Sequence, residues 1–301
     1  MNKWLGAILV VVVLFVIASL FSGFFLDSNS VSSDSIVVVP LHGVITIDGG
    51  ESNLFSATSE ISSTKIVKKI QELNDDDLVK GVIFEIDSPG GAVVPSKEIG
   101  DAIKKLNKPN YAVIRGVGAS GGYWIASSTD KIFANEMSIT GSIGVIGSYL
   151  EFSELFDKYG INYERFVSGD LKDLGSPYRE LNDYERMVFQ GKIDKIHEYF
   201  VKEVAENRGI SVEEVDRLAT GEIYLGVEAK ELGLIDEFGD DEKAVDIMKK
   251  ELNNDNLDVV YLENQVGLLE LLGSVGAYHF GRGFAHELSQ VEIKNSYQIT
   301  A

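Results

Sequence analysis

The chain has 301 residues, of which 45% are hydrophobic and 25% charged, as in a folded globular protein with a sizeable core. Its net charge of −20 argues against nucleic acid as a partner, because the phosphates would be repelled. The chain has no cysteine, which excludes disulfides and thiolate catalysis, and the spacing of its four histidines, at positions 42, 197, 279 and 286, does not indicate a zinc site.

The first 26 residues carry the clearest regional signal. Residues 4–26 contain no charge, and as a helix they would reach about 34 Å, enough for a hydrocarbon core of ~30 Å. A cleaved secretory signal is the alternative, but its apolar region would be only ~7–15 residues long, followed by a small-residue cleavage site. We therefore predict a retained transmembrane anchor at residues 1–26, inserted in the cell membrane and contacting its lipid. Lys3 before the span and acidic residues after it place the rest of the chain outside the cytoplasm.

A serine-rich tether, residues 27–35, is predicted to precede one α/β domain at residues 36–256. In this domain short apolar runs alternate with segments of helical periodicity, which favours a mainly parallel sheet covered by helices. Strands are predicted at residues 36–45 (as a strand or a hairpin), 81–87, 111–116, 131–134, 143–149 and 161–167. Helices are predicted at residues 60–76, 95–107, 121–130, 182–207 and 211–219. Residues 257–301 form a C-terminal tail to which no motif assigns a role.

Two glycine-rich turns follow two neighbouring predicted strands. "DSPGGA", residues 87–92, follows the first, and "GVGASGG", residues 116–122, follows the second. Loops at the carboxyl ends of parallel strands line the ligand crevice, so we expect the two turns to face each other. Ser120 begins a helix, where the Gly121 N–H and the helix dipole lie beside its oxygen. Paired N–H donors beside a hydroxyl are what acyl transfer needs, and Ser120 is the predicted nucleophile.

A serine nucleophile needs a base, and histidine is the first possibility. The stretch "GASGG" matches the G-x-S-x-G nucleophile elbow of the α/β-hydrolases, whose partners follow in the order serine, acid, histidine. Asp236 with His279 or His286 would supply that order. His197, on a long predicted helix, is interpreted as a surface residue.

Lysine is the second possibility. Lys172 lies in a glycine-flanked loop after the predicted strand 161–167. A lysine acts as a base only when desolvation lowers its pKa from ~10.4 toward 7. Asp170 and Asp173 would oppose this by favouring the charged ammonium, so they must point elsewhere if Lys172 is the base.

Four stretches together resemble the signal peptide peptidase A family, which comprises membrane-anchored serine peptidases of the Clp/crotonase fold. They are "DSPGG", "GVGASGGYWIASSTDKIFANEMSITGSIGVIG", "SGDLKDLGSPYRELNDYER" and "GEIYLGVEAKELGLIDEFG". The resemblance covers residues 36–250 in consistent order and spacing. It implies a spiral of βαβ units and a Ser–Lys dyad that needs no cofactor or metal. Carried over by motif, Ser120 is the nucleophile, Lys172 the general base, Ser142 the residue that orients the lysine, and Gly90 and Gly121 the oxyanion-hole donors.

The resemblance also implies substrates and partners. Family members cut hydrophobic peptides such as cleaved signal peptides, and single-copy relatives form oligomers in which serine and lysine come from adjacent subunits. We therefore expect a homo-oligomer. In some relatives a C-terminal tail enters the active-site groove, and residues 295–301 are a candidate for that role. A crotonase-fold enzyme acting on acyl-coenzyme A substrates and a non-enzymatic scaffold are the alternatives.

Overall fold

The computed structural model describes residues 33–49 and 60–262, so the predicted anchor at residues 1–26 and most of the tail lie outside the described residues. Within the described ranges, no helix is both long and apolar enough to cross a membrane. The strands are β1 (Ser35–His42), β2 (Val44–Thr46), β3 (Glu60–Ser62), β4 (Val79–Ser88), β5 (Asn110–Ala119), β6 (Lys131–Ala134), β7 (Ile139–Gly141), β8 (Ile223–Leu225), β9 (Glu237–Phe238) and β10 (Asp258–Tyr261). The helices are α2 (Ser63–Asp75), α3 (Val93–Ile103), α4 (Gly121–Ser127), α5 (Ser153–Lys158), α6 (Asp183–Arg208), α7 (Val212–Leu218), α8 (Gly226–Glu231) and α9 (Asp241–Glu251).

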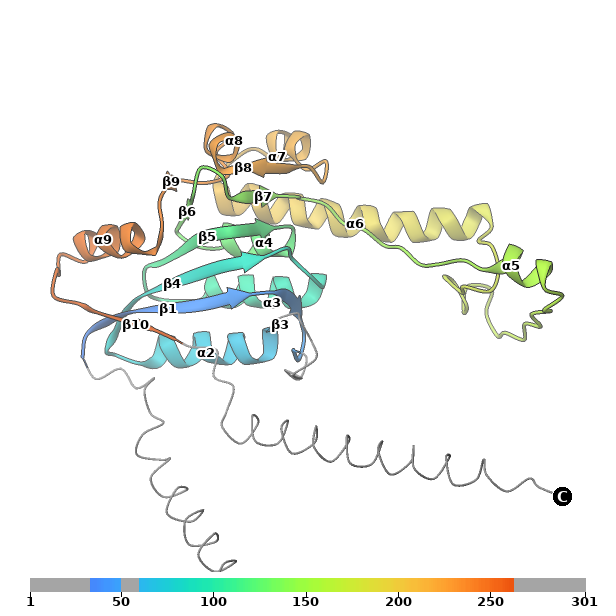
Figure 1. Cartoon of the computed structure of the whole chain (residues 1–301), viewed down its shortest axis with the longest axis horizontal. Coiled ribbons are helices and arrows are strands. Elements are labelled where there is room, and N and C mark those ends of the chain that lie inside the picture. The colour runs from blue at the N-terminus through green and yellow to red at the C-terminus, as the bar shows by residue number, and fades with distance from the viewer. Residues whose placement is uncertain (1–32, 50–59, 263–301) are drawn as a thin grey trace, which may run out of the picture.

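A parallel sheet organises these elements (Figure 1). Its strands lie in the order β10-β1-β4-β5-β6-β9, and every neighbouring pair along this path is parallel. The carboxyl end of β5 pairs with β7, and β8 adds to β7 in the antiparallel direction. The mixed α/β architecture with a mainly parallel sheet is therefore confirmed.

Alternation along the strands gives the sheet two buried faces. In β1, Val37 and Val39 belong to the larger cluster, beneath α2, α3, α4 and the C-terminal half of α6. Ile36 and Val38 point to the opposite face and pack with residues of α9. Successive side chains of a strand point to opposite faces, and a strand buried on both faces reads as a continuous apolar run. This explains "IVVV" in the sequence.

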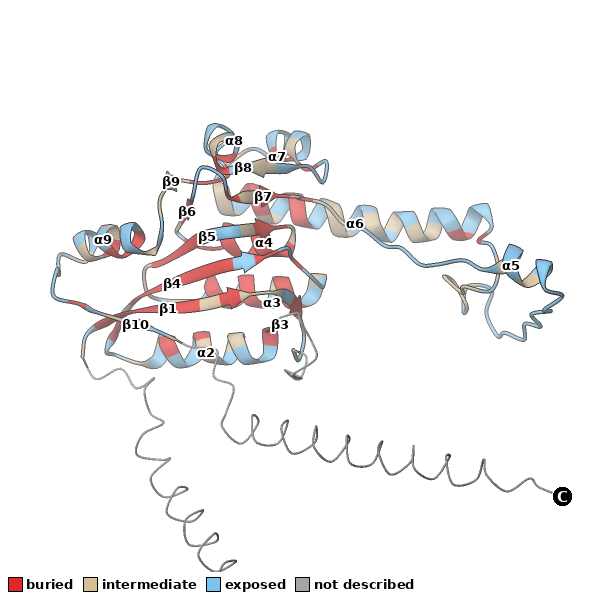
Figure 2. Cartoon of the chain, viewed as in Figure 1, coloured by how far each residue is buried: buried red, intermediate tan, exposed pale blue. Residues whose placement is uncertain are grey.

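Beyond β7 the chain leaves the sheet. It runs along α6 to α5 and returns to the start of α6 at the end away from the sheet (Figure 1). We call residues 144–195 the arm. Its side chains are mostly exposed, whereas those of the sheet are mostly buried (Figure 2).

Several predicted boundaries are wrong. Residues 36–45 form no hairpin, because β1 joins the main sheet while β2 pairs in parallel with β3 in a separate sheet. The predicted strands 143–149 and 161–167 are irregular in the structure. The strand near the first of these segments is β7, which ends at Gly141. Residues 258–261, assigned to the tail, form β10 and pair with β1. An apolar run in the sequence indicates that its side chains are buried or make contacts. Whether the run forms a strand depends on hydrogen bonds to a neighbouring strand, which the pattern does not report.

Candidate active site

Ser120 lies at a sharp turn between β5 and α4. Its backbone adopts φ 52° and ψ −120°, a conformation that costs a non-glycine residue of order 1–3 kcal/mol. Two backbone bonds hold it there: the Ser120 N–H donates to the Gly141 carbonyl at 2.8 Å, and the Trp124 N–H donates to the Ser120 carbonyl at 3.0 Å. The turn also needs Gly122 after the serine, because a Cβ at Gly122 would lie 2.8 Å from the Ser88 carbonyl oxygen. The predicted elbow is therefore present.

The turn of residues 87–92 packs directly against this elbow. A Cβ at Gly90 would lie 2.8 Å from the Gly121 nitrogen and 2.9 Å from the Ser120 Cβ, so only glycine permits the approach. The two glycine-rich turns thus face each other, as the strand order predicts.

The hydrogen bonds in this turn favour Gly91 over Gly90 as an oxyanion donor. The Gly90 N–H donates to Ser88 Oγ at 3.1 Å, and that hydroxyl donates to the Gly43 carbonyl at 2.6 Å. Gly91 lines the cavity beside Ser120, and its backbone nitrogen lies 3.3 Å from an ideal Cβ on Gly121. The bonds to β2 use the Gly90 carbonyl and the Ala92 N–H and leave the Gly91 N–H out. These bonds therefore favour Gly91 as the oxyanion donor instead of the predicted Gly90, whose small size allows the close approach of the two turns.

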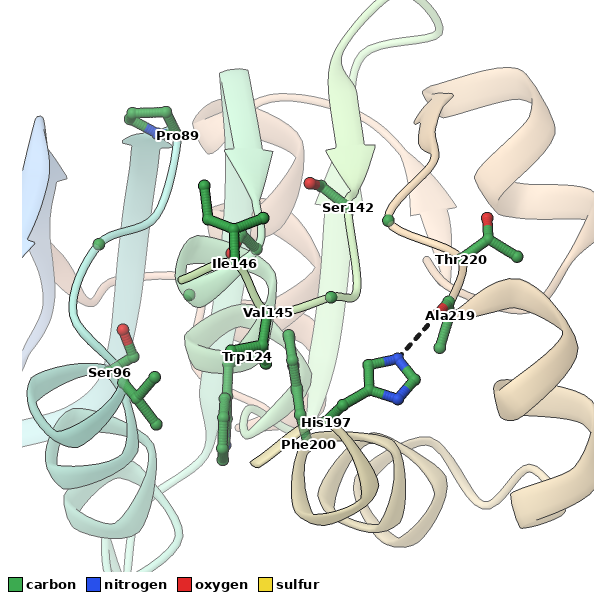
Figure 3. A pocket seen from close by; sticks show the side chains of 16 residues that line it. Pro89, Ser96, Trp124, Ser142, Val145, Ile146, His197, Phe200, Ala219 and Thr220 are labelled. Atoms are coloured by element: carbon green, nitrogen blue, oxygen red, sulfur yellow. Dashed lines mark hydrogen bonds between the residues drawn. The ribbon is translucent and has the colours of Figure 1, made fainter. Parts of the chain in front are cut away.

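A cavity of about 460 Å³ opens at Ser120 (Figure 3). Trp124 and Phe200 form one wall as a stacked pair, with ring centroids 4.4 Å apart. Val145 and Ile146, from the first residues of the arm, form another part of the lining. The sequence offers no local signal for these lining residues, because α4, α6 and the arm meet here only in the folded chain.

Ser142 lines the same cavity. It directly follows Gly141, which pairs with Ala119, the residue before Ser120. Its own backbone has φ 49°, and its N–H donates to the Glu222 carbonyl at 2.7 Å. Ser120 and Ser142 therefore follow the paired ends of β5 and β7 and line one cavity, and the lysine-orienting role of Ser142 stays a prediction.

The structure does not bring Lys172, the predicted base, to this cavity. It is exposed, in the segment between α5 and α6 at the outer end of the arm (Figure 1). The cavity lining includes Ser120, Gly121 and Ser142 but not Lys172. Within residues 33–49 and 60–262, no carboxylate forms an ion pair with Lys172.

The histidine candidates separate clearly. His197 was predicted as a surface residue, but it lines the cavity, and its Nε2 lies 2.8 Å from the Ala219 carbonyl oxygen (Figure 3). A carbonyl only accepts, so Nε2 carries the proton. Asp236 accepts from both Arg208 amino groups, at 2.8 and 3.0 Å, and from the Ile132 N–H, which is a structural role. His279 and His286 lie outside the described residues.

A strained serine at a strand-to-helix turn, the closely packed backbones of Gly91 and Gly121 and an adjoining cavity define the class as a serine hydrolase on a parallel α/β sheet. Comparison with known proteins narrows this class. The model of peptidase family S49 matches residues 102–255, and that of Clp protease matches residues 53–139, which is consistent with a Clp/crotonase fold. The chain belongs to peptidase family S49 and is a serine peptidase.

Individual relatives agree with this assignment. The chain is 40% identical to the protein named "Putative signal peptide peptidase SppA" of Enterococcus faecium, over 77% of this chain and 68% of that protein. It is 36% identical to "Putative protease MJ0651" of Methanocaldococcus jannaschii, over 76% of this chain and 75% of that protein. "Protease 4" of Haemophilus influenzae is 32% identical, over 73% of this chain but only 35% of that longer protein.

Proposed function

We propose that this chain is a membrane-anchored Ser–Lys endopeptidase whose active site is completed by a second copy of the chain. The observation that carries the proposal is the separation of the two halves of the dyad. Ser120, Gly91, Gly121 and Ser142 surround one cavity, while Lys172 stands exposed at the outer end of the arm. A neighbouring copy that lays its arm across this cavity would supply the missing base.

The surface of the arm supports a second copy as the partner. Large apolar side chains of the arm are exposed to solvent, among them Ile146 at 92% and Phe166 at 91% exposure. Exposed apolar side chains that gather in one segment favour an interaction site there. Ile146 belongs both to this exposed set and to the lining of the cavity, which among the described residues includes no lysine.

The proposed reaction proceeds by covalent catalysis. Ser120 Oγ attacks the scissile carbonyl carbon while neutral Lys172 Nζ takes its proton, and the N–H groups of Gly91 and Gly121 bind the oxyanion. The lysine then protonates the leaving amine as the C–N bond breaks. The same lysine takes a proton from water, which attacks the acyl-enzyme ester and returns Ser120 to its free form.

We propose hydrophobic peptides, including cleaved signal peptides, as substrates. The cavity beside Ser120 is walled by Trp124, Phe200, Val145 and Ile146, which favour apolar side chains over charged ones. An anchor at residues 1–26 would hold the peptidase at the extracytoplasmic side of the cell membrane, close to hydrophobic peptides in the lipid. The name of the Enterococcus faecium relative is consistent with this substrate class.

Mixing inactive chains tests the proposal. Ser120→Ala and Lys172→Ala should each abolish cleavage of a fluorogenic hydrophobic peptide by the detergent-solubilised full-length protein. Co-assembly of the two variants should restore part of the activity, because some sites would combine an intact serine from one copy with an intact lysine from the other. No recovery in verified mixed assemblies would contradict a shared site.

A histidine base is the second candidate, because His197 lines the same cavity as Ser120. Its Nε2 donates to the Ala219 carbonyl, so only Nδ1 remains as an acceptor. Under this candidate, His197→Ala would abolish cleavage and Lys172→Ala would not. The Ser–Lys proposal expects the opposite pattern, with His197→Ala changing mainly KM.

A further inference from the structure

The loop that carries Lys172 contains a side-chain network that the proposed reaction does not use. Its centre is Asp173, the residue next to the lysine. Arg179 Nε and Nη2 donate to the two Asp173 carboxylate oxygens at 2.9 Å each. Arg165 Nη2 donates to Oδ1 at 2.6 Å, and Arg165 Nε lies 2.6 Å from Oδ2. Each oxygen of this carboxylate is therefore engaged by both guanidinium groups.

The same arginines anchor the loop on both sides. Arg179 also donates to the Glu185 carboxylate at 2.5 and 2.8 Å, and the Glu185 side chain is only 2% exposed. Glu185 belongs to a capping box with Asn182 that begins α6. Arg165 donates to the Asp170 main-chain carbonyl at 3.0 Å. The loop is thus tied to α6 and to the segment before it.

We propose that Arg165 and Arg179 are positioning residues for the catalytic base, because they saturate the Asp173 carboxylate and so prevent it from pairing with the Lys172 ammonium. This inference rests on the proposed function, in which Lys172 must be neutral to act. We call Arg165, Asp173, Arg179 and Glu185 the arginine clamp.

The physical argument concerns the protonation of the lysine. A carboxylate within ~4–6 Å of an ammonium favours the charged form, which cannot act as a base. Asp173 directly follows Lys172 in the sequence, so its negative charge must be neutralised by other groups if Lys172 is to lose its proton easily. The hydrogen bonds of Arg179, followed by those of Arg165, hold the pKa of Asp173 well below its ordinary range, so the carboxylate stays ionised and paired with the arginines.

Arginine suits this role better than lysine does. Its planar fork matches a carboxylate with two parallel hydrogen bonds, and it remains charged at all relevant pH values. The four charges of the arginine clamp sum to zero, so the clamp adds no net charge beside the base. Besides the clamp and Lys172, the charged side chains of the loop and of the segments next to it in sequence are Glu164, Asp170, Glu180, Asp183 and Arg186. On the proposed facing copy, the cavity that would receive Lys172 is lined by the uncharged Ser120 and Ser142 and by His197, whose Nε2 donates to the Ala219 carbonyl.

A pH profile separates this role from a merely structural one. Arg179→Met in the assembled full-length enzyme leaves the clamp with a net negative charge beside Lys172. We expect the acid limb of kcat/KM to move to higher pH by about 1 unit, which is about a tenfold loss of activity on that limb. Adding Asp173→Asn should return the limb to its wild-type position. An unmoved limb in Arg179→Met, or a limb that Asp173→Asn does not restore, would overturn the inference.

Two further variants keep the experiment decisive. Arg186 directly follows Glu185 in α6 but is not part of the clamp. Arg186→Met removes one positive charge there and should leave the acid limb of kcat/KM at its wild-type pH. A shift as large as that of Arg179→Met would show a general charge effect and overturn the inference. If Arg179→Met does not assemble, Arg165→Met removes one fork while it keeps the Arg179–Glu185 pair, and it should shift the limb in the same direction.

Lys172→Ala, measured alongside, separates the two proposals. Activity in Lys172→Ala would reject the lysine base and, with it, the reason for the clamp. An inactive Lys172→Ala with unshifted clamp variants would reject the clamp alone.

Discussion

The two ends of α6 show two different regions of one molecule. Toward its C-terminus, Phe200, Val201, Val204 and Ala205 are buried, and the helix packs on α4 and α7. Toward its N-terminus, in the arm, the buried side chain is that of Glu185, a charged group held by Arg179. The same helix is thus stabilised by apolar packing at one end and by ion pairs and capping at the other.

This difference matches the proposed mechanism, in which the sheet end supplies the nucleophile and the arm supplies the base. The sheet end holds Ser120 and its N–H donors rigidly, where a strained backbone needs dense packing around it. The arm end presents Lys172 and an apolar surface, which fit a role in contact with a second copy. A region built for a partner keeps its apolar side chains outside its own core.

The largest contrast is expected from one substitution made in both regions. Phe200→Ala removes a side chain that is 2% exposed and stacked on Trp124, and should cost about 3–5 kcal/mol of unfolding free energy. Phe166→Ala, at a 91% exposed position in the arm, should cost less than about 0.5 kcal/mol in dissociated chains. Urea unfolding followed by circular dichroism measures both. Similar costs would show that the arm packs on its own chain.

Glycine substitutions sharpen the comparison at the level of the backbone. A Cβ at Gly91 would lie 2.2 Å from the Ile45 carbonyl oxygen, so Gly91→Ala should cost about 3 kcal/mol and displace an oxyanion donor. Gly160, in the arm, has φ +66°, and no atom of the described residues lies within 4 Å of an added Cβ. Gly160→Ala should therefore cost only about 1 kcal/mol of backbone strain and leave the activity unchanged. Unfolding curves and peptide cleavage assays on the same samples measure both effects, and equal losses would contradict the contrast.

A charge placed on the arm should act on assembly rather than on folding. Leu150→Asp, at a 73% exposed position, should weaken self-association at least about tenfold, because burying an unpaired carboxylate in an apolar interface is costly. Met137→Asp, at a 62% exposed position near β7, is the matched control and should assemble normally. Sedimentation velocity in detergent distinguishes the two. Normal assembly of Leu150→Asp would place the interface elsewhere.

The smallest expected effect is a difference in pH sensitivity. The Arg179 hydrogen bonds, with one from the Asn182 backbone, lower the pKa of Glu185 to about 2 from its ordinary 4.5. A depressed pKa contributes stability above pH 4.5 that is lost as the pH falls toward 2. The arm should therefore open first in acid, seen as faster hydrogen exchange in the first turn of α6 after correction for intrinsic rates. Glu185→Gln should remove this pH dependence.

The sheet end should respond to the opposite extreme. Burial raises the pKa of Tyr123 above its ordinary 10, and its hydroxyl donates to the Leu234 carbonyl at 2.9 Å. A raised pKa contributes stability that is present below pH 10 and lost as the pH rises further. Tyr123→Phe should make the stability of the core depend less on pH above 10. If the arm and the core unfold together both in acid and in alkali, the distinction between the two regions is wrong.

The amino-acid sequence by itself predicted the alternation of strands and helices, the two facing turns and the nucleophile. Period-two and period-3.6 patterns are local, and glycine in a turn reports a backbone need within a few residues. The motif around Ser120 is also contiguous, so the elbow between β5 and α4 could be expected without any knowledge of distant contacts.

Only the tertiary structure decided which groups surround that serine. The Gly90 N–H is already used by Ser88, and His197 lies on the cavity wall because α6 packs across α4, a contact between segments far apart in the chain. The saturation of Asp173 by two arginines likewise depends on how the arm folds back on itself. Availability of a hydrogen-bonding group is a property of its neighbours in space, and local patterns carry no record of those neighbours.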